Sequence, residues 1–99
     1  MFDMPNPSSP PFNPYGRICL FACSAAHYLG VEIAEYLRIK PGEYTRAVFP
    51  NENIFIRLNE SVRGQDVYVV QTFGTRIHDS LFEMLIMIDT LKRDSAGRI

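Results

Sequence analysis

The sequence lacks the features that would assign a function from composition alone. Its two cysteines, Cys19 and Cys23, have no histidine or further cysteine at zinc-ligand spacing, so neither a zinc knuckle nor a disulfide framework is implied. The formal net charge is only -1, so nothing favours nucleic acid or an anionic membrane as a partner. The longest apolar run, residues 84–88, is too short to span a bilayer, and the N-terminus lacks an apolar secretory-signal region. We therefore expect a cytoplasmic protein.

Catalytic motifs are also missing. The sequence has no glycine-rich phosphate-binding or dinucleotide pattern and no nucleophile elbow. Of the two histidines, only His78 has an acidic neighbour, Asp79. Adjacent residues diverge on a helix, so this pair is interpreted as the start of a helix, with a metal or catalytic dyad as the alternative. A chain of 99 residues forms at most one domain, which is small for a complete two-lobed active site.

The order of the expected elements indicates an α/β fold. Residues 1–16 contain five of the seven prolines and are predicted to be a disordered leader, followed by one folded domain over residues 17–99. Apolar periodicity predicts strands over 17–21, 43–49, 53–58 and 65–72, and helices over 26–38 and 80–94. Residues 95–99 are interpreted as a turn and the start of another strand. The fold class is a mainly parallel sheet with an antiparallel excursion around residues 43–58.

Three details of this prediction concern individual side chains. Ser24 is expected to cap the first helix, and the spacing of Ser80 and Glu83 predicts a capping box at the second. The continuous apolar run in residues 65–72 is typical of a central strand covered on both faces. Apolar residues surround most of the second helix, which predicts burial on more than one side and hence further sequence or a partner subunit.

Two polar loops between the strands are the candidate sites. Residues 50–53 combine amide and carboxylate groups next to Phe49, a set that suits a nucleobase, although Pro50 and Asn51 are equally explained as turn residues. Residues 59–66 contain Ser61 and Arg63, which with the amide of Gly64 match phosphate oxygens; an exposed turn is again the alternative.

Four segments carry a resemblance to a known family. They are FPNENI at residues 49–54, ESVRGQDVYVVQ at 60–71, DSLFEMLIMID at 79–89 and SAGRI at 95–99. Together they resemble the N-terminal domain of ribose-phosphate pyrophosphokinase, with similarity from about residue 17 to the last residue. The resemblance implies a phosphoribosyltransferase-like domain that is incomplete at its C-terminus. It also implies a Mg²⁺-dependent enzyme that transfers diphosphate from ATP to ribose 5-phosphate, giving 5-phosphoribosyl 1-diphosphate for nucleotide biosynthesis.

The resemblance further implies roles for individual residues. Phe49 packs on the adenine of ATP, and Asn51 and Asn53 hydrogen-bond to it, with Glu52 as a substitute because most members carry an acidic residue at the position of Asn53. Ser61 and Arg63 bind a regulatory phosphate.

Both sites are shared between subunits in the family, so a homo-oligomer is expected, with no nucleic acid or membrane partner. The family's catalytic residues, its metal ligands and its ribose 5-phosphate site fall beyond residue 99, so we expect no catalytic or metal-binding residue here and no activity of the chain alone. The alternative function is a non-catalytic interaction module that assembles with full-length synthase subunits.

Overall fold

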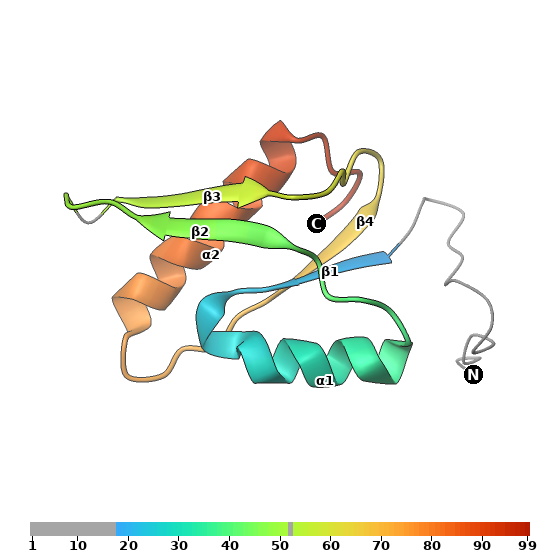
Figure 1. Ribbon diagram of the computed structural model, residues 1–99, viewed down its shortest axis with the longest axis horizontal. Helices are drawn as coiled ribbons and strands as arrows, with labels where there is room; N and C mark the ends of the chain where they lie inside the picture. Colours follow the sequence, from blue (N-terminus) through green and yellow to red (C-terminus); the bar gives the residue numbers. More distant parts are fainter. Residues whose placement is uncertain (1–17, 52) are drawn as a thin grey trace.

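The computed structural model describes residues 18–51 and 53–99, in which strands and helices occur in the predicted order. The strands are β1 (Ile18–Ala22), β2 (Tyr44–Val48), β3 (Ile54–Leu58) and β4 (Asp66–Val70). The helices are the 3₁₀ turn η1 (Ser24–Ala26), α1 (His27–Leu37) and α2 (Ile77–Arg93) (Figure 1). The predicted leader, residues 1–16, and Glu52 lie outside the described residues. The α/β fold class is confirmed.

Strands β1 and β4 form the parallel part of the structure. They pair in register from Ile18 opposite Asp66 to Ala22 opposite Val70. On the other edge of β4, Arg98 makes a parallel bridge to Asp66, and the Val67 N–H donates to the Arg98 carbonyl oxygen at 2.7 Å. The predicted start of a further strand after α2 is therefore confirmed as a single bridge, and β4 lies between two neighbours. Its predicted cover on both faces is wrong within the described residues, because the Tyr68 side chain is 56% exposed.

Strands β2 and β3 form the predicted antiparallel excursion, a hairpin that lies against α2 (Figure 1). Alternation along β3 places Ile54, Ile56 and Leu58 on one face, and these residues pack into the core. The core lies between this hairpin, α2 and one face of the parallel pair. Its buried members among the described residues are Phe21, Cys23, Ile56, Val62, Val67, Met87 and Leu91.

The helix caps differ from the prediction. Ser24 is the first residue of η1, its N-cap is Cys23, and neither η1 nor α1 has a side-chain cap. Helix α2 begins at Ile77, three residues before Ser80, whose N–H already donates to the Arg76 carbonyl oxygen at 3.0 Å. The capping box of Ser80 and Glu83 is therefore wrong. Ser80 and Glu83 have the spacing of a capping box, but the Glu83 side chain is buried. It forms hydrogen bonds with Ser24, distant in the sequence, in place of the local bond to the backbone at Ser80.

Helix α2 buries one side only within the described residues. Glu83, Met87 and Leu91 lie against the core, whereas Phe82 is 61% and Leu85 51% exposed. The predicted burial on a second side is not found in this part of the chain. No helix among the described residues is both long and apolar enough to cross a membrane.

Candidate functional site

The first polar loop is the tip of the β2–β3 hairpin. The Phe49 N–H donates to the Asn53 carbonyl oxygen at 2.9 Å, and the Asn51 side-chain oxygen accepts the Asn53 N–H at 3.3 Å. The Phe49 ring is 49% exposed and lies beside that of Phe55, with 6.2 Å between the ring centroids. The tip is thus a genuine turn that also presents an aromatic surface to solvent, so the turn and the nucleobase interpretations are compatible.

The second polar loop connects β3 to β4. Ser61 and Arg63 are both exposed, and the Ser61 hydroxyl oxygen accepts the Arg63 N–H at 3.4 Å. Gly64 has a φ of +70°, a conformation that favours glycine, and its N–H donates to the Ser95 carbonyl oxygen at 2.9 Å. The expected contribution of the Gly64 amide to an anion site is therefore wrong, because that donor is already used. The Ser61 hydroxyl and the Arg63 guanidinium remain as the candidate groups.

The segment after α2 lies against this second loop. The sequence did not indicate this contact. Ala96 makes an antiparallel bridge to Arg63, and a Cβ atom added to Gly97 would lie 2.8 Å from the Gly64 carbonyl carbon. The small residues of SAGRI allow this approach, and they were the only signal available. The two polar loops lie at opposite ends of β3, so the structure does not combine them into one site (Figure 1).

The sequence also did not indicate a buried polar junction centred on Glu83. This side chain is 2% exposed, and its two carboxylate oxygens accept the Ser24 N–H at 2.9 Å and the Ser24 hydroxyl at 2.6 Å. Arg46 of β2 completes the junction with an Nε to carboxylate distance of 3.4 Å. A single carboxylate thus joins α2, the η1 turn that follows β1, and the hairpin. A glutamate on a helix whose other residues are mostly apolar was the available signal.

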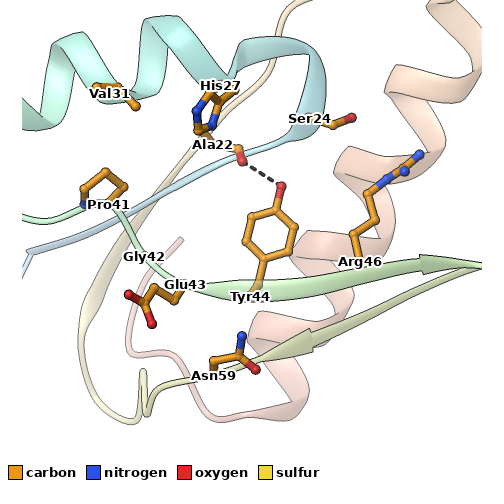
Figure 2. A pocket seen from close by; sticks show the side chains of 10 residues that line it. All are labelled: Ala22, Ser24, His27, Val31, Pro41, Gly42, Glu43, Tyr44, Arg46 and Asn59. Carbon is orange, nitrogen blue, oxygen red and sulfur yellow. Dashed lines mark hydrogen bonds between the residues drawn. The ribbon is translucent and has the colours of Figure 1, made fainter.

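Two clefts meet at this junction. The larger, of about 740 Å³, lies between the start of α1 and β2 and is lined by His27, Tyr44 and Arg46 among others (Figure 2). The smaller, of about 370 Å³, lies beyond the carboxyl ends of β1 and β4 and includes Thr72, Arg76 and Glu83. Ser24 and Arg46 border both. Clefts beyond the carboxyl ends of parallel strands are the usual ligand positions in α/β folds.

Burial near the junction suppresses ionisation of two neutral groups. Tyr44 donates its hydroxyl proton to the Ala22 carbonyl oxygen at 2.8 Å, as Figure 2 shows. Burial, and secondarily the Glu83 charge, raises the pKa of Tyr44 to about 12 and the pKa of the Cys23 thiol to about 12. A thiol with so high a pKa is not a nucleophile near neutral pH, so Cys23 is a structural residue.

A metal site is not formed by the described residues. Among residues 18–51 and 53–99, no group of three or more His, Cys, Asp or Glu side chains is arranged to hold an ion. His78 and Asp79 lie in the first turn of α2, and Asp79 pairs with Arg76 at 3.7 Å.

Comparison with known proteins places the chain among its relatives. Residues 18–99 match the family described as the N-terminal domain of ribose phosphate pyrophosphokinase. A ribose-phosphate pyrophosphokinase of Gloeobacter violaceus is 41% identical over 83 residues, which are 84% of this chain and 25% of that protein. The enzyme of that name from Haemophilus influenzae is 43% identical over 82 residues, 83% of this chain and 26% of that protein.

A solved structure shows the same relationship. The crystal structure of phosphoribosylpyrophosphate synthetase from Mycobacterium smegmatis superimposes with a TM-score of 0.80 at 43% identity, covering 83% of this chain and 28% of that one. The chain thus spans about a quarter of the length of these relatives. The match to the family extends from β1 to the last residue, and the resemblance carried by the four segments is confirmed. The chain belongs to the family of the N-terminal domain of ribose phosphate pyrophosphokinase.

Proposed function

We propose that this chain supplies the adenine-binding hairpin of a ribose-phosphate pyrophosphokinase. In that enzyme diphosphate passes from ATP to ribose 5-phosphate with Mg²⁺ and gives 5-phosphoribosyl 1-diphosphate. The observation that carries the proposal is the exposed aromatic and amide surface at the hairpin tip, made by Phe49, Asn51 and Asn53. Adenine offers a flat ring for stacking, together with an amino donor and ring-nitrogen acceptors that a side-chain amide matches.

The hairpin tip is only half of an adenine pocket. An exposed ring covers one face of a base, and the other face requires residues from outside the described part of the chain. We therefore propose that the pocket is completed by a second subunit in a homo-oligomer in the cytoplasm. The ribose 5-phosphate site, the magnesium ligands and the catalytic groups are proposed to lie in the parts of the relatives that this chain does not span, and the chain alone is expected to be inactive.

The test compares two phenylalanines of equal exposure. Phe49 is 49% and Phe73 is 48% exposed, and only Phe49 lies at the hairpin tip. Titration of ATP into the chain, followed by NMR, should show about a tenfold weaker affinity for Phe49→Ala, since base–aromatic stacking contributes roughly 1–3 kcal/mol. Phe73→Ala should bind as the unsubstituted chain does. Equal effects of the two substitutions, or no effect of Phe49→Ala, would refute the adenine site.

The second loop is proposed to bind a regulatory phosphate. Ser61 and Arg63 are both exposed on this loop, and the Arg63 backbone N–H donates to the Ser61 hydroxyl oxygen. The Ser61 hydroxyl and the Arg63 guanidinium are the donors proposed for the phosphate, and the guanidinium bond would be charge-assisted. Titration with inorganic phosphate should shift the backbone amides of residues 61–64, and Arg63→Met should abolish the shift. Persistence of the shift in Arg63→Met would contradict this assignment.

A second candidate function is that of an interaction module, which the exposed apolar side of α2 favours. Leu81, Phe82 and Leu85 are 40%, 61% and 51% exposed on one stretch of helix. Apolar surface of this kind marks protein interaction sites. After co-expression with a full-length synthase, the chain should co-elute with it in size-exclusion chromatography, and Leu85→Lys should prevent co-elution. Separate elution of the unsubstituted chain would count against the module.

A further inference from the structure

An arginine occupies the inward face of the hairpin. Side chains alternate along β2, so Tyr44, Arg46 and Val48 share one face, and Arg46 is the register partner of Ile56. Ile56 is 5% exposed and belongs to the core, which identifies this face as the inward one. A cation on a face otherwise directed at apolar neighbours requires a partner of opposite charge.

Glu83 is that partner. The Arg46 Nε lies 3.4 Å from the Glu83 carboxylate, and the Arg46 side chain is 34% exposed whereas that of Glu83 is 2% exposed. The carboxylate is itself held by the two Ser24 hydrogen bonds, so it cannot follow the hairpin if the hairpin moves. Apolar contacts tolerate sliding, but a pair of charges with one fixed member specifies a direction and a distance.

The Arg46–Glu83 pair lies where a contact with the domain can restrict the orientation of the hairpin tip. Phe49 is three residues beyond Arg46, a distance of about 10 Å in an extended strand. Over that span Val48 is 55% exposed, and on the paired strand Phe55 is 47% exposed. Only Ile54 continues the packing against the core. The tip is therefore held from its base, where β2 makes two directional contacts with the rest of the domain. Tyr44 donates to the Ala22 carbonyl oxygen at 2.8 Å, and the Arg46–Glu83 pair lies two residues closer to the tip.

We propose that Arg46 is a positioning residue for adenine binding: its ion pair with Glu83 sets the orientation in which the hairpin tip presents Phe49 and Asn51 to the nucleotide. This inference rests on the proposed function of the tip. The physical reason is that ligand affinity falls in proportion to the population of the binding-competent arrangement. Without the pair the tip samples other orientations. If about a tenth of the population remains competent, ATP affinity falls about tenfold.

The first test measures the tip without any ligand. Arg46→Met removes the charge and keeps an unbranched side chain, and Arg57→Met is the matched control, because Arg57 lies on the outward face of the same hairpin opposite Thr45. Residual dipolar couplings, measured by NMR in a weakly aligning medium, report the orientation of the Phe49 N–H at the tip relative to the core N–H of Val67. Arg46→Met should reduce the Phe49 coupling, because the tip then averages over several orientations, and should leave the Val67 coupling unchanged. An unchanged Phe49 coupling, or an equal reduction at Val67, would overturn the proposal.

The second test measures ATP affinity in the same variants. We expect about tenfold weaker binding for Arg46→Met, recovery in Arg46→Lys because the charge returns, and no change for Arg57→Met. Equal weakening in Arg46→Met and Arg57→Met would overturn positioning by the pair. If Phe49→Ala does not affect ATP binding, the adenine site fails, and the dipolar couplings still decide whether Arg46 orients the tip. The two failures are thus distinguishable.

Discussion

Replacing Glu83 with alanine should remove a large part of the free energy of unfolding of this domain. The carboxylate accepts two hydrogen bonds from Ser24, at 2.9 and 2.6 Å, and lies 3.4 Å from the Arg46 Nε. A hydrogen bond to a charged group contributes about 1.5–3 kcal/mol. Ser24 and Arg46 are accessible to water in the variant, so their donors are rehydrated and the low end of that range applies. The expected loss is about 3 kcal/mol, against a total of roughly 5–10 kcal/mol for a domain of this size.

Urea unfolding followed by circular dichroism measures this loss. With a slope of roughly 1.5 kcal/mol per molar urea, the midpoint should fall by about 2 M in Glu83→Ala. Glu83→Gln keeps one carbonyl oxygen as an acceptor for Ser24 and should lose about half as much. Glu35→Ala is the control, because Glu35 is an exposed glutamate on α1, and its midpoint should stay within about 0.3 M of the unsubstituted chain.

The same measurement separates the tertiary junction from a helix cap. A capping-box glutamate would contribute about 1 kcal/mol or less, close to the usual range for caps. A loss in Glu83→Ala that equals the loss in Glu35→Ala would refute the reasoning, since it would show that the Ser24 and Arg46 contacts contribute nothing to stability.

Two further predictions concern titration and close packing. Because the folded-state pKa values of Tyr44 and Cys23 are raised from 10 and 9 to about 12, the unfolded chain loses these protons first. Between pH 7 and 8 these two groups should therefore leave the urea midpoint unchanged, and the midpoint should fall as pH rises from 9 towards 12, less steeply in Tyr44→Phe. A midpoint at pH 10.5 equal to that at pH 8 would contradict the assignment. Gly42→Ala should destabilise by about 1–3 kcal/mol, because its Cβ would lie 2.6 Å from the buried Phe21 ring. Gly74→Ala, with open space around it, is the control, and equal unfolding midpoints of the two variants would contradict this prediction.

Local pattern was sufficient for most of the fold. The alternation of Ile54, Ile56 and Leu58 predicted β3, because one face of a half-buried strand must be apolar at every second residue. The order of strands and helices predicted a mainly parallel sheet with an antiparallel excursion around residues 43–58, and the structure has the parallel pair β1 and β4 and the antiparallel pair β2 and β3. These features depend on neighbours in the chain, and a single sequence contains that information.

Side-chain partners distant in sequence could not be predicted in this way. The Ser80–Glu83 spacing fitted a cap, yet Glu83 bonds Ser24, 59 residues away. The inward position of Arg46 follows from strand alternation, but its partner does not. Similarly, the sequence predicted the polar loop that contains Arg63, but it did not predict that Ala96 forms an antiparallel bridge with Arg63.

The sequence by itself determined the family, the strand and helix order and the two exposed polar loops, because these are properties of local pattern and of matched segments. Tertiary structure alone decided that Glu83 joins three elements and that the Gly64 amide is already occupied. The physical reason is that a buried charge takes whichever donors the packed chain brings within hydrogen-bond distance, and packing is set by the whole fold.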